Sequence, residues 1–309
     1  MFSKNPDLFD CAPVLIAMRN LRFGIQVATM VTAWACLLPF HANGQGPSKQ
    51  RPTVPKVDQI DQEEGAKLIE KFRLQRLRGD YVFHFDLENI PRRGKKSIYE
   101  GIIWGTWNDK GPLSRAIIWS PGKPNEPLMQ IIAQGGAKPE VWLWEPGKDV
   151  RALEPKEFFE PLLPNNHYSA FDLLMPFVFW DKYQYEGSKR VKGRPAHQFV
   201  MWPSDSIREA RPDLGAAFIA LDANYNALVK AELLDESGDE IQTIEVQSFK
   251  EVDDQYIIKQ IDLLEEVTRD KSRFIVRGAA VNQKLDPKTF DPKQIKSIPD
   301  TRKIPFKGV

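Results

Sequence analysis

Residues 81–87 read Tyr-Val-Phe-His-Phe-Asp-Leu, and here the sequence changes from a helical period to a period of two. Tyr81, Phe83, Phe85 and Leu87 alternate with Val82, His84 and Asp86. Such alternation is typical of a half-buried β-strand, because successive side chains of a strand point to opposite faces of the sheet. The stretch therefore predicts that a sheet begins at about residue 81.

Similar alternating runs predict more strands along the rest of the chain. They lie at 97–107, 113–120, 127–133, 140–145, 182–191, 195–203, 216–222, 226–234, 241–250, 256–266 and 273–282. The connections are short and rich in turn residues, as at Asn108-Asp109-Lys110-Gly111, and no long helix separates the strands. We therefore expect a mainly β fold with helices (α+β). Its antiparallel sheet should follow meander order and curve strongly into an incomplete β-barrel, covered by helices on its concave face.

The residues before the first strand predict three segments. Residues 58–78 have the period of an amphipathic helix, with Ile60, Leu68, Ile69 and Phe72 on the apolar stripe. Residues 45–57 form a Pro-rich, flexible linker. Residues 1–44 are typical of a cleaved signal peptide: basic residues Arg19 and Arg22, an apolar run at 23–38, and small residues at 42–44. The start is either Met1 or Met18, and the alternative to cleavage is an inner-membrane anchor formed by the uncleaved leader.

Composition and charge narrow the classes of function. The chain has 43 basic and 42 acidic residues and a net charge of +1, so nothing in the overall charge favours nucleic acid as a partner. Its two cysteines, Cys11 and Cys36, both lie in the leader, so the domain itself offers no disulfide or thiolate metal site. The common nucleophile, phosphate-binding and zinc motifs are absent, and His84, His167 and His197 are isolated. We expect neither an enzyme nor a protein with a metal or other cofactor.

The strand pattern is interrupted at 151–181, where the block 171–180 reads Phe-Asp-Leu-Leu-Met-Pro-Phe-Val-Phe-Trp. Pro176 prevents a continuous helix through this block, which is too apolar to face water. It is either a plug of ordinary core or an apolar cover over a pocket lined by large side chains. The residues predicted to line that pocket or its cover are Leu173, Leu174, Met175, Phe177, Phe179, Trp180, Trp104, Trp142, Trp144, Phe199 and Met201.

This layout resembles the LolA-like outer-membrane lipoprotein-sorting family. The resemblance covers roughly residues 58–292 and rests on Val141-Trp142-Leu143-Trp144-Glu145-Pro146, on Phe218–Asp222 followed by Leu228–Glu232, on the hairpin Leu234–Asp239, and on Phe290-Asp291-Pro292. It implies a half-barrel domain at 58–292, closed by helices around a hydrophobic cavity. Residues 293–309 would follow as an extended C-terminal tail.

The resemblance also implies a function. A periplasmic, monomeric member of this family would shelter the acyl chains of lipids or lipoproteins in its cavity and catalyse no reaction. Its partners would be the acylated lipoprotein or lipid and proteins of the inner or outer membrane. The alternative is an envelope-stress sensor or protein-interaction module on the same scaffold.

Overall fold

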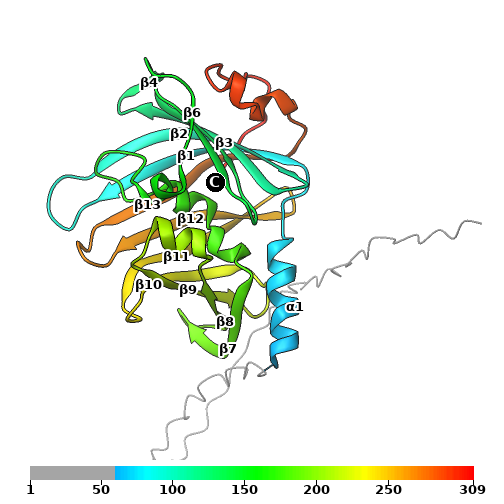
Figure 1. Ribbon diagram of the computed structural model, residues 1–309. Helices are drawn as coiled ribbons and strands as arrows, with labels where there is room; N and C mark the ends of the chain where they lie inside the picture. The colour runs from blue at the N-terminus through cyan, green and yellow to red at the C-terminus, as the bar shows by residue number, and fades with distance from the viewer. Residues whose placement is uncertain (1–59) are drawn as a thin grey trace, which may run out of the picture. The chain divides into compact units, whose positions relative to one another are not determined.

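The computed structural model describes residues 60–309. The predicted leader and linker lie outside the described residues. The helix predicted over 58–78 is present as α1 (Gln62–Arg73), which ends earlier than expected, at the C-cap Leu74. The Asp61 side chain caps its first turn by accepting a hydrogen bond from the Glu64 backbone N–H at 2.9 Å. Acidic residues in its first turn and basic residues in its last suit the helix dipole. Figure 1 shows α1 standing beside the sheet.

The sheet contains every predicted strand. Its long strands are β1 (Asp80–Ile90), β2 (Ser97–Asn108), β3 (Gly111–Ser120), β4 (Lys123–Gln134), β5 (Glu140–Trp144), β7 (Lys182–Val191), β8 (Arg194–Trp202), β9 (Leu214–Asp222), β10 (Leu228–Asp235), β11 (Glu240–Val252), β12 (Gln255–Glu265) and β13 (Lys271–Gln283). Two strands of two residues, β6 (Arg151–Ala152) and β14 (Lys307–Gly308), complete it. Neither was predicted, because two residues carry no readable alternation.

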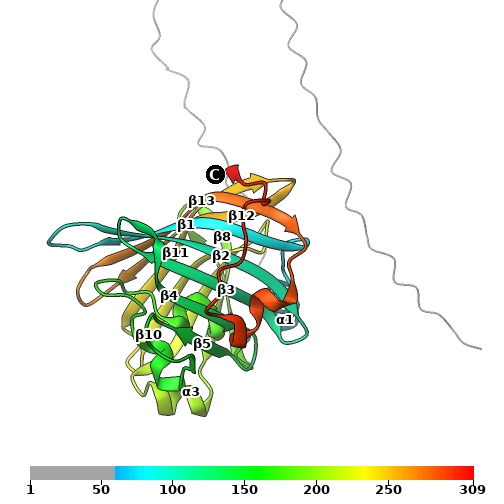
Figure 2. The ribbon, with the colours of Figure 1, turned by 90° about the horizontal axis from the view of Figure 1, so that it is seen from above.

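All pairings between these strands are antiparallel, and the order is β6-β5-β4-β3-β2-β1-β13-β12-β11-β10-β9-β8-β7. The two meanders β1–β6 and β7–β13 are therefore joined by the pairing of β1 with β13, and β6 and β7 are the two edges. Figure 2, seen from above, shows the strands curving around the covering helices. The expectation of a curved, unclosed antiparallel sheet with few helices is confirmed.

Short helical pieces fill the connections. The segment between the two sheet edges carries η1 (Pro155–Phe159), α2 (Ala170–Leu174) and η2 (Pro176–Phe179), while α3 (Asp205–Ala210) joins β8 to β9, and η3 (Pro287–Phe290) and η4 (Pro292–Gln294) follow β13. Helix α2 begins at a capping box formed by Ser169 and Asp172. It ends because Met175 adopts a left-handed conformation, with φ of 43°, immediately before Pro176.

The two faces of the sheet bury different clusters. On the inner face, Phe85, Ile131 and Ile219 join one large cluster with Ile69 of α1 and the helical pieces between β6 and β7. On the outer face, Val82, Ile102, Trp104 and Ile117 pack against Phe290 of η3. The alternation that predicts the strands thus separates two apolar layers, each covered by a different part of the chain.

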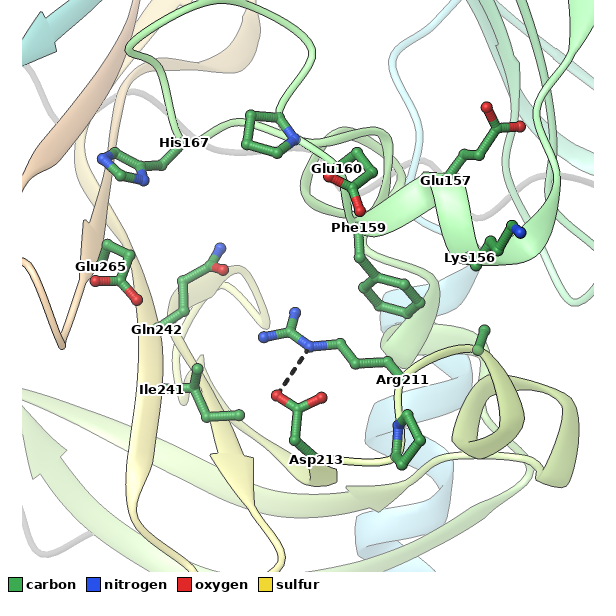
Figure 3. A pocket seen from close by; sticks show the side chains of 13 residues that line it. Lys156, Glu157, Phe159, Glu160, His167, Arg211, Asp213, Ile241, Gln242 and Glu265 are labelled. Carbon is green, nitrogen blue, oxygen red and sulfur yellow. Dashed lines mark hydrogen bonds and ion pairs between the residues drawn. The ribbon is translucent and has the colours of Figure 1, made fainter.

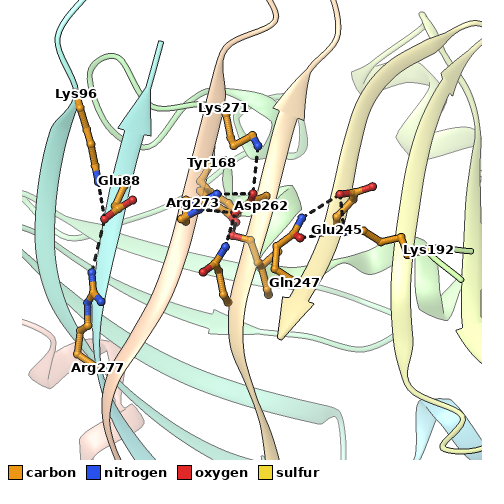
Figure 4. Close-up of polar contacts among 12 residues, drawn as sticks. Glu88, Lys96, Tyr168, Lys192, Glu245, Gln247, Asp262, Lys271, Arg273 and Arg277 are labelled. Carbon is orange, nitrogen blue, oxygen red and sulfur yellow. Dashed lines mark hydrogen bonds and ion pairs between the residues drawn. The ribbon is translucent and has the colours of Figure 1, made fainter. Parts of the chain in front are cut away.

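Farther along the outer face, β1, β13, β12 and β11 carry ion pairs (Figure 4). Asp262 accepts hydrogen bonds from Arg273 at 2.6 and 2.8 Å, and Lys271 lies 3.2 Å from the same carboxylate. Burial alone would raise the pKa of the Asp262 carboxyl, but these two cations outweigh it and lower that pKa.

Across residues 60–309, no helix is long and apolar enough to span a membrane.

Candidate functional site

The candidate site is the segment 153–181, which we call the lid because it crosses the inner face from edge strand β6 to edge strand β7. Its centre is a group of three buried rings. Phe171 and Phe177 have ring centroids 5.9 Å apart, and Trp180 lies 6.4 Å from each of them. Phe171 and Phe177 have no exposed surface, and Trp180 is 7% exposed. The lid therefore inserts its own aromatic side chains into the space that the curved sheet encloses.

The predicted site residues do not all lie together. Seven of the eleven lie in the inner cluster or against it: Phe177, Trp180, Phe199 and Met201 are buried there, and Leu174, Met175 and Phe179 are partly buried against it. Leu173, in α2, is not part of that cluster and is 37% exposed. Their role as ligand contacts remains a prediction.

The remaining three, Trp104, Trp142 and Trp144, are not in the inner cluster. Trp104 packs on the outer face with Phe290. In β5 the inner positions belong to Val141 and Leu143, so strand alternation turns Trp142 and Trp144 to the other face. Alternation shows which residues share a face, but it does not show which face is inside. We therefore correct the prediction for these tryptophans: in this structure they do not line the same space as the lid.

Arg73, at the end of α1, fixes the lid to that helix. Its Nε donates to the Val178 carbonyl oxygen at 2.8 Å, and its Nη2 donates to the Trp180 carbonyl oxygen at 2.7 Å. The guanidinium also lies 5.2 Å from the centroid of the Tyr183 ring and 2.7 Å from Glu70. Sequence reasoning missed the role of Arg73. The helix dipole alone explains an arginine in the last turn of a helix, so its position does not indicate a contact with the lid.

A buried carboxylate joins α2 to the sheet. Asp172 is 5% exposed and accepts hydrogen bonds from the Ser169 backbone N–H at 2.8 Å, from the Ser169 hydroxyl at 2.6 Å, and from Gln242 Nε2 of β11 at 2.5 Å. Burial raises the pKa of the Asp172 carboxyl, although these donors oppose the rise. No ion pair to Asp172 occurs within the described residues, so the amide of Gln242 supplies its contact with the sheet.

Other polar contacts join the lid to the sheet at scattered points, including an ion pair between Glu157 and Arg151 of β6 at 2.6 Å. The Tyr99 hydroxyl donates to the Pro164 carbonyl oxygen at 3.1 Å, and the Tyr168 hydroxyl donates to the Ile261 carbonyl oxygen at 3.3 Å. The His167 backbone N–H donates to the Ser272 hydroxyl at 2.8 Å. Most of the lid's attachment is consequently apolar packing, which a ligand of similar chemistry could replace.

A polar pocket of about 440 Å³ opens where the lid meets α3 and β11 (Figure 3). Arg211 lies 5.2 Å from the ring centroid of Phe159 and 3.4 Å from Asp213, and it reaches toward Gln242. The lining mixes Lys156 and Arg211 with four acidic residues: Glu157, Glu160, Asp213 and Glu265. Within residues 60–309, no three His, Cys, Asp or Glu side chains gather closely enough to hold a metal ion.

The fold of this chain is shared by several solved structures. A putative outer membrane lipoprotein-sorting protein domain from Vibrio parahaemolyticus matches with a TM-score of 0.66 at 13% identity, over 76% of this chain and 98% of that one. A protein of a domain-of-unknown-function family from Desulfovibrio piger matches with a TM-score of 0.66 at 12% identity, over 76% and 98%. A LolA superfamily protein from Nitrosomonas europaea gives a TM-score of 0.57 at 12% identity, over 73% and 96%. At these identities the likeness defines the fold, which is LolA-like, as the sequence motifs predicted.

The family itself follows from a sequence match. A family model described as "Uncharacterized protein" matches residues 128–297, more than half of the chain, and the chain belongs to that family. No curated protein matches the sequence.

Proposed function

We propose that this protein shelters the acyl chains of lipids or lipoproteins beneath the lid during their passage through the periplasm, without making or breaking a bond. The observation that carries the proposal is the filling of the sheet's inner face by the lid's own aromatic side chains, Phe171, Phe177 and Trp180. These rings occupy a site whose chemistry suits an acyl chain, so a ligand can take their place when the lid lifts.

The energetics favour such an exchange. Each methylene removed from water contributes roughly 0.8 kcal/mol, so burying a long acyl chain is worth on the order of 10 kcal/mol. Lifting the lid exposes three aromatic rings and breaks the hydrogen bonds from Arg73 and Gln242. The acyl chain restores apolar contact to the sheet, and the return of the lid's own rings drives release. A carrier needs this near balance, because it must both take up and deliver its cargo.

Locking the lid tests the proposal. Because the cysteines of the chain, Cys11 and Cys36, lie before the domain, a domain starting at residue 45 accepts an engineered cysteine pair without competition. We place the pair at His167 and Ser272, because the His167 backbone N–H donates to the Ser272 hydroxyl at 2.8 Å and so brings lid and sheet together there. We expect the oxidised His167→Cys/Ser272→Cys variant to reject a fluorescent fatty-acid probe and the reduced variant to bind it.

Two controls complete this experiment. The single variants His167→Cys and Ser272→Cys should bind the probe under both redox conditions. Equal uptake by the oxidised and reduced double variant would refute entry beneath the lid. If no form binds the probe, and native mass spectrometry of the protein purified from the periplasm finds no acylated species, the carrier function itself is refuted.

A second candidate function, as a sensor or protein-interaction module, is favoured by a different surface. Leu74 is 72% exposed, and Tyr225 and Tyr256 are each 67% exposed. Gln75 donates to the Tyr225 carbonyl oxygen at 3.3 Å, which places Tyr225 beside the end of α1. The Tyr256 phenol donates to Glu251, which raises the pKa of Tyr256, and Tyr225 lies near enough to add to that rise. Tyrosines are enriched at protein interfaces.

This candidate is tested by cross-linking in cells. A photo-reactive residue at Tyr225 or Tyr256 should capture the same envelope protein, whereas one at Val267, which is 83% exposed but belongs to the β12–β13 turn, should not. Capture at all three positions, or at none, would count against an interface at this surface.

A further inference from the structure

The segment after β13 covers the outer face of the sheet and is held there by a buried arginine. Arg115 of β3 is 1% exposed. Its Nη1 donates to the Thr289 carbonyl oxygen at 3.0 Å, and its Nη2 donates to the Ile295 carbonyl oxygen at 2.8 Å and to that of Ser297. A guanidinium carries its charge at all ordinary pH values, and a buried charge is costly unless it is paired.

No carboxylate pairs with this charge among the described residues. Among residues 60–309, the only side-chain acceptor of Arg115 is the neutral amide of Gln130, at 2.8 Å from Nη2. Backbone carbonyl dipoles and one amide compensate a full charge only in part. Burial accordingly lowers the pKa of the Arg115 guanidinium to about 10.

Two buried N–H donors at this place also have no acceptor within the described residues. They are Arg115 Nε and Gln130 Nε2, on two side chains that are hydrogen-bonded to each other. The arrangement of Gln130 is fixed, because a flipped amide would turn its NH₂ group toward the guanidinium. Buried polar groups are rarely left unsatisfied. What is missing beside Arg115 is thus an acceptor, and the uncompensated charge favours an anionic one.

A pocket leads to this arginine. Its volume is about 460 Å³, and Arg115 lines it together with the three lysines Lys284, Lys288 and Lys303. None of these three ammonium groups makes a hydrogen bond or ion pair within residues 60–309, although Lys303 lies near Asp300. Two acidic residues line the same pocket, Asp286 and Asp300, and Asp300 is neutralised by Arg302, which donates to both of its oxygens at 2.9 and 2.8 Å. The pocket is therefore cationic, with its deepest charge unpaired.

We propose that this pocket, between β3 and the C-terminal segment, binds a phosphate group, with Arg115 as the deep contact and Lys284, Lys288 and Lys303 at the rim. Arginine and lysine together are the usual protein ligands of phosphate, since a guanidinium offers a planar set of donors and an ammonium a point charge. The phosphate is either free or part of a lipid headgroup, and Trp104, Leu285 and Ile304 in the lining would contact the apolar part of the latter. The site is independent of the lid, since it lies on the opposite face of the sheet.

Calorimetric titration of the full domain with inorganic phosphate, at constant ionic strength, tests the site. We expect phosphate to bind and to raise the melting temperature, while chloride does neither. The double variant Lys288→Glu/Lys303→Glu should weaken binding by about tenfold or more, since each charge-assisted contact is worth over 1 kcal/mol and 1.4 kcal/mol is tenfold. Lys296→Glu is the matched control, because Lys296 is exposed in the same segment but does not line the pocket.

Further arms distinguish the two sources of phosphate. A short-chain phosphatidic acid, used as monomers, should bind more tightly than inorganic phosphate if the natural ligand is a headgroup, and no more tightly if it is free phosphate. Arg115→Met should abolish binding of either. Arg115→Met also removes the hydrogen bonds that hold the C-terminal segment to the sheet. The lysine variants keep these bonds, so they test phosphate binding in a domain with an intact fold. The proposal is overturned if neither compound binds, or if Lys296→Glu weakens binding as much as the rim variants do.

Discussion

Replacing Arg73 by methionine should release the lid while leaving the sheet intact. The side chain is 13% exposed, so water screens its contacts little. It donates one hydrogen bond to each of two lid carbonyl oxygens, those of Val178 and Trp180. Hydrogen bonds from a charged donor contribute roughly 1.5–3 kcal/mol each, so their loss should lower the free energy of lid opening by roughly 3 kcal/mol or more.

Hydrogen exchange measures this effect directly. A change of about 3 kcal/mol corresponds to more than a hundredfold rise in the open population. Amides protected by the lid's own short helices, such as those of Met175 and Trp180, should exchange faster by that factor. Amides at the centre of β1 should keep their rates, because the sheet does not need the lid to stay paired. Under the proposed function, the same variant should take up a fatty-acid probe faster.

Arg76→Met is the matched control. Arg76 is exposed, follows α1 and lies 5.9 Å from the ring centroid of Trp107, so its removal should not alter exchange in the lid. The reasoning fails if Arg73→Met leaves lid exchange unchanged while the urea midpoint of the whole domain falls. That result would mean that Arg73 stabilises the whole domain against unfolding and does not specifically hold the lid closed.

Three other perturbations follow from the structure. Phe177→Ala should cost roughly 3–5 kcal/mol in urea unfolding, because its ring is fully buried, whereas Phe177→Leu should cost much less; a loss below about 1 kcal/mol for the alanine would contradict the packing. The raised pKa of Asp172 means that the folded state binds this proton more tightly than the unfolded state, so stability should fall as pH rises from 3.8 through the raised value. Asp172→Asn should remove that part of the slope in thermal melts across this range, and an unchanged slope would exclude Asp172 as its source. Gln62→Ala should expose the edge of β7, since the Gln62 side-chain amide accepts from the Tyr185 N–H at 3.0 Å and donates to the Tyr185 carbonyl oxygen at 2.7 Å. We expect this variant to associate in a concentration-dependent way in sedimentation. A strictly monomeric variant would show that Gln62 is not what protects this edge.

Local patterns predicted the elements of this fold well, and they failed where the determining contacts are distant in sequence. The alternation in Tyr81–Leu87 and its repeats located every long strand, because half-buried strands impose a period of two. The pairing of β1 with β13 turns two meanders into one sheet. It joins residues 181 to 203 positions apart, and no local sequence pattern indicates it. The six-residue helix α3 is too short to show a helical period.

The same limit applies to the candidate sites. The apolar block 171–180 stood out because no strand pattern explains it, and the structure places it over the inner face. Arg73 and Arg115 did not stand out, since their partners are backbone carbonyls more than 100 residues away, and any sequence supplies carbonyls. Whether Trp142 faced inward depended on which side of the sheet the rest of the chain would cover, which β5 alone does not determine.

The lid is tied covalently to both margins of the sheet, since β6 leads into it and β7 leaves it. A lid attached at one end could rotate away from the sheet about a single hinge. Because this lid is attached at both ends, it can only move outward in its middle or follow the two edge strands as they separate. If ligands enter beneath the lid as proposed, the width of the opening is limited by the length of the lid segment and not by the sheet. Under the proposed function, insertions or deletions between β6 and β7 should change the largest acyl cargo that the protein admits, while the strands that shape the interior stay the same.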